Sequence, residues 1–195
     1  KLFRRHAIYM KQGSKPQKEN PLETIQQITS RFIGFEIAEH HKDHCIIKNM
    51  VELSSKEFDS SLRRVFLLLQ QMGEEMVEAI KTNNKEILRH THDIDINIDK
   101  FHDYCIRVLN KTGFKSSKKS NLIFTILFLL EMIGDEFKNI SFHINDDLNG
   151  RKLDNLLQLG EMTVSQLNKF CDLFYNFEKS KVVEMSKVDK EIYFY

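Results

Sequence analysis

Two pairs of carboxylate side chains, each spaced one helical turn apart, are the residues of this sequence best suited to chemistry. Asp95 and Asp99 form the first pair, and Glu131 and Asp135 form the second. Side chains four residues apart lie on one face of a helix, with their Cβ atoms about 5–6 Å apart. Like charges at that separation repel each other. We therefore expect a cation between the two pairs, either a metal ion or a basic side chain.

The chemistry of a carboxylate site limits the choice of cation. Carboxylate oxygens bind hard or borderline metal ions such as Mg²⁺, Mn²⁺, Ca²⁺, iron and Zn²⁺. Glu131 is surrounded in sequence by apolar residues, which predicts that little of its helix is solvated. A carboxylate held near apolar surface is costly unless a cation neutralises it. The alternative to a metal is an ion pair with one of three nearby basic residues: Lys100, Arg107 or Lys138.

The composition excludes several classes of protein. The 29 Lys and Arg residues balance the 28 Asp and Glu residues to a net charge of +1, so no bulk charge demands nucleic acid or an anionic membrane. Three widely spaced cysteines favour neither a disulfide framework nor a zinc ribbon, and they fit a reducing cytoplasm. The longest apolar run, residues 122–130, is about half of the roughly 20 residues that span a membrane.

Apolar periodicity predicts a mainly α protein built from antiparallel helical bundles, preceded by a short helix and a β-hairpin. Only two prolines and seven glycines interrupt the chain, which favours long helices. The N-terminal part is expected to form a helix at 22–31 and strands at 32–38 and 45–50. A long helix should run from Ser54 to a break at 82–84, and the next should end at Gly113. A basic loop at 114–119, followed by a helix cap at Ser120, should lead to helices at about 121–144 and 153–177 and to a last helix beginning near Ser180.

The carboxylate motifs resemble the paired signatures of the PhoU family of phosphate uptake regulators. That family carries a Glu/Asp-x-x-x-Asp motif on two adjacent helices of each repeat, as in Asp95–Asp99 and Leu130–Ile140 here. The helix segment Met72–Val77 is similar to the opening helix of the family. The stretch from Phe32–Ile37 through Phe58–Arg64 resembles an archaeal subgroup, in which an AbrB-like DNA-binding domain precedes the helices. The resemblance spans about residues 30–192, and its most specific part is the segment from Glu131.

The resemblance implies a domain organisation of tandem three-helix bundles. Residues 1–52 would be a linker region with the short helix and hairpin, residues 53–146 the first three-helix repeat, and residues 151–195 the start of a second, incomplete repeat. The second repeat departs from the pattern, because Asp189 is followed four residues later by Tyr193. The chain begins with Lys and its last residues read as the middle of a helix, so we expect a fragment of a longer protein.

The resemblance also implies a function and a set of metal ligands. PhoU proteins are cytoplasmic regulators of phosphate homeostasis rather than enzymes, and their partners are the phosphate transporter ATPase and a sensor kinase. By position, Asp95, Asp99, Glu131 and Asp135 would hold an iron or zinc cluster, with Mg²⁺ or Mn²⁺ as alternatives, and Asn139 would brace these ligands as a hydrogen-bond donor. DNA would be bound only through a missing N-terminal domain, and a homo-oligomer is expected.

Two alternatives stay open beside a PhoU-like regulator. The spacing of Asp99 and His102 matches the acid-x-x-His motif of di-iron bundles, which suggests a ferritin-like or haemerythrin-like oxidoreductase. No second such motif follows in the next helices, so His92 and His102 are expected to be peripheral and solvated. The other alternative is a metal-free helical interaction module. A histidine cluster in the hairpin loop is expected to be a flexible polar turn; its members are His40, His41 and His44.

Overall fold

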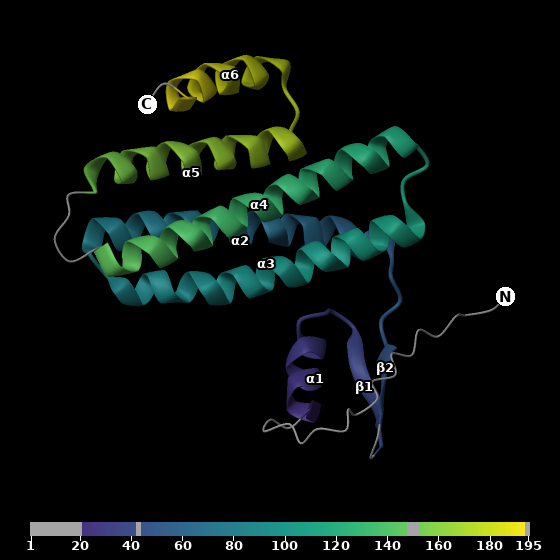
Figure 1. Ribbon diagram of the computed structural model, residues 1–195. Coiled ribbons are helices and arrows are strands. Elements are labelled where there is room, and N and C mark those ends of the chain that lie inside the picture. Colours follow the sequence, from purple (N-terminus) through teal and green to yellow (C-terminus); the bar gives the residue numbers. More distant parts are fainter. Residues whose placement is uncertain (1–20, 42–43, 148–152, 194–195) are drawn as a thin grey trace.

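The computed structural model describes residues 21–41, 44–147 and 153–193, which form a helical bundle beside a small N-terminal module (Figure 1). Three long antiparallel helices make up the bundle. A fourth helix packs against the first of them, and a last, shorter helix packs on the fourth. The predicted mainly α architecture is confirmed. Within the described residues, none of the helices has the length and apolar character needed to cross a membrane. The three long helices of the bundle are α2 (Ser55–Thr82), α3 (Lys85–Thr112) and α4 (Ser117–Asp147); the fourth helix is α5 (Asp154–Tyr175) and the last is α6 (Lys179–Tyr193).

Short polar residues set the boundary between the first two long helices, as the sequence predicts. Asn83 adopts the left-handed conformation (φ +53°) and ends α2. The side chain of Asn84 then accepts a hydrogen bond of 2.9 Å from the backbone N–H of Glu86 and caps α3. Because the connection is so short, α2 and α3 must run antiparallel.

The predicted boundary between α3 and α4 is partly wrong. Gly113 ends α3 as expected, but α4 begins at Ser117, inside the segment expected to be a basic loop. Ser120 does not cap the helix, since it lies within the first turn of α4. Its hydroxyl instead accepts a hydrogen bond of 2.9 Å from the backbone N–H of Phe114, so a backbone donor of the preceding loop has a partner within α4.

The core lies where α2, α3 and α4 meet. Close approach of α4 depends on Gly134, where an added Cβ would lie 3.2 Å from a methyl group of Leu69. Cys105 is fully buried, as its place on the apolar stripe predicts, and burial raises the pKa of its thiol to about 12. All three helices contribute to the most deeply buried apolar side chains of the bundle, which include Val65, Phe66, Leu69, Met72, Ile98, Val108, Leu127 and Leu130.

The N-terminal module consists of α1 (Pro21–Ser30) and an antiparallel hairpin of β1 (Phe35–His40) and β2 (Cys45–Asn49). The predicted hairpin is confirmed, but its first strand begins three residues later than expected. Residues 32–34 form a turn instead, in which Gly34 takes a positive φ of +81°. The rings of His41 and His44 stack at 4.5 Å in the hairpin loop, whose residues 42 and 43 lie outside the described part.

One side chain of α3 ties this module to the bundle. The guanidinium of Arg107 donates hydrogen bonds to the backbone oxygen of Ile33 (2.7 Å) and to the side chain of Asn49 (3.2 Å). It also lies 4.2 Å from the centre of the Phe35 ring. Arg107, one of the three expected counter-ions of the carboxylates, therefore binds the N-terminal module instead.

Candidate carboxylate site

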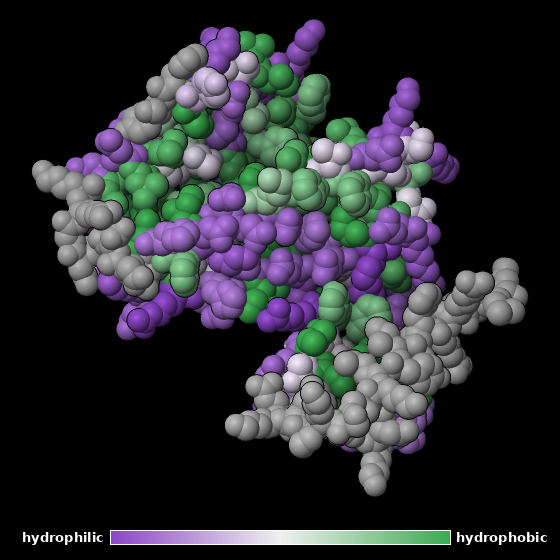
Figure 2. Space-filling model, viewed as in Figure 1, coloured by the Kyte–Doolittle hydropathy of each residue, from purple (hydrophilic) through white to green (hydrophobic). Residues whose placement is uncertain are grey.

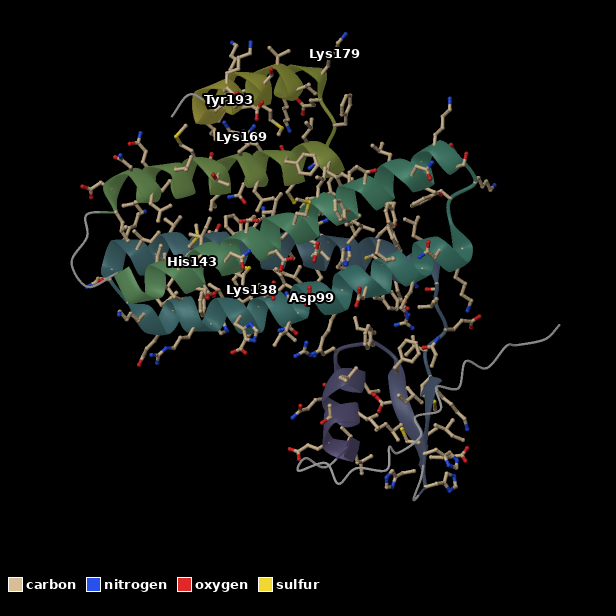
Figure 3. The ribbon with its side chains drawn as sticks, viewed as in Figure 1. Asp99, Lys138, His143, Lys169, Lys179 and Tyr193 are labelled. Carbon is tan, nitrogen blue, oxygen red and sulfur yellow. The ribbon has the colours of Figure 1, made fainter. Side chains whose placement is uncertain are left out.

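The four predicted carboxylates come from two helices that face each other. Asp95 and Asp99 lie on α3, and Glu131 and Asp135 lie on α4. Figure 3 shows Asp99 on α3 and Lys138 on α4 where these two antiparallel helices run side by side. The two pairs are close enough for their charges to interact, since Asp95 and Asp135 both act on Asp99. The structure therefore brings the sequence-predicted residues together as one acidic group.

The cation within this group is Lys138. Its ammonium donates a hydrogen bond of 2.9 Å to Oδ2 of Asp95 and one of 2.5 Å to Oδ1 of Asp135, so it bridges the two helices. Asp95 is more deeply buried than its place beside the apolar stripe suggests, because only 6% of its side chain is exposed. Burial alone would lower the pKa of Lys138, but its hydrogen bonds and the charges of Asp135 and Asp95 outweigh burial and raise that pKa.

Two of the carboxylates, Asp99 and Glu131, have raised pKa values. Burial raises the pKa of Asp99, and the neighbouring charge of Asp95 raises it further, although Lys138 acts in the opposite direction. Burial also raises the pKa of Glu131, and so do the charge of Asp135 and a hydrogen bond to it. Both groups therefore favour a proton, or another cation, more than an ordinary exposed carboxylate does.

Replacing Asp99 with Asn is expected to stabilise the metal-free protein at neutral pH by about 0.5 kcal/mol, the size of a like-charge pair one turn apart. A carboxyl with a raised pKa in the folded state helps folding only while protonated, so this help is complete below its ordinary pKa of 3.8 and is lost as the pH rises through the raised value. Urea unfolding in EDTA should show the gain of Asp99→Asn at pH 7 but not below pH 3.8. An equal gain at both pH values would contradict this explanation.

The prediction that His102 is solvated is wrong. Only 16% of its side chain is exposed, and its Nε2 atom is buried without a hydrogen-bond partner among the described residues. A positive charge on His102 lowers the pKa of Glu131, so the imidazole lies near the acidic group. His102 follows Asp95 and Asp99 by seven and three residues, and this spacing along one face of α3 is the signal that could have placed it there. His92, by contrast, is exposed as expected.

The predicted bracing residue does not hold the acidic group by a hydrogen bond in the described structure. Asn139 is exposed, and its amide donates no hydrogen bond to the four carboxylates in the described structure.

An open groove of about 710 Å³ between α2 and α5 is lined by other charged side chains, among them Lys81, Glu161 and Asp172. None of the four carboxylates lines this groove; they lie instead at the contact between α3 and α4.

The donor chemistry of the group fits a hard or borderline metal ion, but the geometry is incomplete. Within the described residues no three His, Cys, Asp or Glu side chains are placed so that they could hold one ion. The ammonium of Lys138 lies between Asp95 and Asp135, where a shared cation would lie. A metal ion on these carboxylates would therefore have to displace Lys138.

Comparison of the chain with family models, with curated proteins and with solved structures found no match. The resemblance to PhoU consequently rests on the residues and their helical placement alone. Those residues, with Lys138 and His102 beside them, are the basis for a functional assignment.

Proposed function

We propose that this protein is a non-enzymatic, cytoplasmic regulator of phosphate homeostasis, a PhoU-like helical scaffold that works by binding other proteins. The observation that carries the proposal is the meeting of Asp95 and Asp99 on α3 with Glu131 and Asp135 on α4. The PhoU motif has its carboxylates on two adjacent helices, as these are. A three-helix bundle continued by α5 and α6 is also the arrangement expected of one repeat and the start of another.

We further propose that the carboxylates bind iron or zinc, with Mg²⁺ or Mn²⁺ as alternatives. The raised pKa values of Asp99 and Glu131 support this: burial is the larger cause of both, and neighbouring carboxylates, whose charge a divalent cation would neutralise, raise them further. Lys138 would compete with the metal for Asp95 and Asp135. The ammonium and the metal are then alternative counter-ions of one acidic group.

This competition gives a direct test. Replacing Lys138 with Gln removes the competing charge, so we expect Zn²⁺ or Mn²⁺ to bind on the order of ten-fold more tightly than to the parent chain. Isothermal titration calorimetry at pH 7 measures both affinities. The matched control is Lys81→Gln, which removes an ammonium from an exposed ion pair with Glu161, between α2 and α5 rather than α3 and α4. Equal metal affinity in the parent and in Lys138→Gln would contradict the proposed competition.

The regulatory role is tested separately, with the phosphate transporter ATPase and the phosphate sensor kinase of the source organism. We expect the purified chain to bind at least one of them directly in surface plasmon resonance, with a dissociation constant in the micromolar range typical of transient regulatory contacts. No binding to either protein, by a chain whose folding and metal content are verified, would contradict the phosphate-regulator assignment and leave only the metal site.

The position of His102 supports a second candidate, a di-iron ferritin-like or haemerythrin-like centre. Its buried and unpartnered Nε2 atom is a nitrogen donor beside Glu131. A di-iron centre predicts that the iron-loaded chain changes its visible absorption on exposure to oxygen and that His102→Gln abolishes the change. A carboxylate-bound regulatory metal predicts no such change in either chain.

A further inference from the structure

The outer face of α4 carries an apolar stripe that no other element of the described structure covers. Leu122, Leu129 and Met132 are 60%, 50% and 45% exposed, and Phe128 beside them is 52% exposed. The apolar residues around Glu131 predict instead that little of this helix is solvated. One side of this helix does face the core, because Ile123, Leu127 and Leu130 are buried. Figure 2 shows hydrophobic residues along α4, above a hydrophilic band that covers α3.

Three of these residues, Leu122, Leu129 and Met132, belong to a set of exposed α4 residues spaced by alternating steps of four and three positions. This is the spacing by which one helix packs along another in a coiled coil. Lys118 stands at one end of the repeat and Glu136 at the other, both are exposed, and neither forms an ion pair with another described residue. The α4 stripe, named so hereafter, comprises Lys118, Leu122, Thr125, Leu129, Met132 and Glu136.

The order of these residues makes the α4 stripe complementary to itself when it is reversed. In an antiparallel pair, Lys118 of one copy faces Glu136 of the other, and Leu122 faces Met132. The two Phe128 rings then lie beside the centre of the contact, on the same side. A parallel pair would instead place like charges together at both ends, which is unfavourable. From the charge pattern and the apolar spacing, we infer that the α4 stripe is the interface of an antiparallel homodimer, α4 against α4 of a second copy.

The size of the face agrees with this occupant. An aromatic side chain presents about 150–250 Å², and Leu and Met are slightly smaller, so the four half-exposed side chains present about 400 Å² in total. The charged ends, Thr125 and the nearby Phe124 bring the face to about 700 Å², close to the roughly 800 Å² that each partner contributes to a standard interface. The interface lies opposite the core-facing side of α4, so dimer formation requires no change in the bundle.

Charge exchange tests both the partner and its direction. Lys118→Glu gives a chain whose two ends are both acidic, and Glu136→Lys gives one whose ends are both basic. We expect each variant alone to dimerise on the order of ten-fold more weakly than the parent chain. An equimolar mixture of the two should regain the parent affinity, because every end then meets its opposite. Sedimentation equilibrium over 1–200 μM protein measures all of these, with a parent dissociation constant expected on the order of micromolar.

Two further variants of the full chain complete the test. Leu129→Asp places a charge at the centre of the stripe and should weaken dimerisation by about a hundred-fold or more. Lys111→Glu changes an exposed lysine on α3 and should leave the dissociation constant unchanged. Circular dichroism verifies that each variant is folded. A parent chain that is monomeric at 200 μM, a dimer that survives Leu129→Asp, or a mixture no tighter than its components would each overturn the inference, the second by placing the contact on another surface.

Discussion

Replacing Lys138 with Met is expected to lower the free energy of unfolding by about 2–3 kcal/mol at pH 7 in EDTA. The substitution keeps most of the apolar stem of the side chain but leaves the carboxylate of Asp95 without its cation. That carboxylate is almost fully buried, and a buried charge that loses its partner is among the costliest single changes in a protein. Lys138 also bridges α3 to α4, so the loss should be seen in the cooperative unfolding of the whole bundle, followed by circular dichroism in urea.

Two other variants separate the charge effect from loss of packing. In the double variant Asp95→Asn/Lys138→Met the uncompensated charge is gone, so most of the lost stability should return. Lys81→Met makes the same substitution in an exposed ion pair with Glu161, and it should have little effect. If Lys138→Met were no more destabilising than Lys81→Met, the bridge would not be what neutralises the acidic group.

Replacing Phe66 with Ala is expected to cost about 4 kcal/mol of unfolding free energy, the typical cost of emptying a fully buried aromatic site. Phe66 is inaccessible to solvent on α2, and its ring contacts three aromatic rings of α5 with centroids 5.3–5.9 Å apart: Phe170, Phe174 and Tyr175. This aromatic cluster attaches α5, and through it α6, to the three-helix bundle. Denaturant unfolding measures the total loss.

Hydrogen exchange locates where that loss falls. We expect the backbone amides of α5 and α6 to lose protection first in Phe66→Ala, because α5 packs mainly on α2 and α6 packs on α5. The matched control is Phe177→Ala, a change at a 73% exposed ring just after α5, which should alter stability by about 0.5 kcal/mol or less. A loss of less than about 1 kcal/mol in Phe66→Ala would mean that the aromatic cluster does not hold α5 in place.

The helices could be predicted because their signals are local. The apolar residues of α2 recur at steps of three and four, Ser54 accepts a capping hydrogen bond from Glu57, and Asn83 and Asn84 mark the break that follows. The start of α4 could not be predicted in the same way. A segment rich in Ser and Lys has the composition of a loop, yet in the structure the backbone N–H of Ser120 already donates a helical hydrogen bond of 3.1 Å to the carbonyl of Ser116.

The four carboxylates could be predicted from their spacing, but their environment could not. Lys138 was one of three basic residues near the acids in sequence, and only the crossing of α3 and α4 selects it and assigns Arg107 to the hairpin. The burial of His102 depends on the same crossing. The exposed α4 stripe was hidden for a different reason. A continuous apolar run has little helical periodicity of its own, so the sequence alone does not divide it into a buried and an exposed face.

The metal content of the purified chain, measured by elemental analysis beside the double variant Asp99→Ala/Asp135→Ala, tests the central proposal most directly. This variant removes one carboxylate from each helix yet leaves Lys138 paired with Asp95, so the bundle should remain folded. We expect stoichiometric iron or zinc in the parent chain and its loss in the variant. Metal retained in the variant, or no metal in a parent chain produced and purified with metals supplied, would contradict a carboxylate-bound metal between α3 and α4.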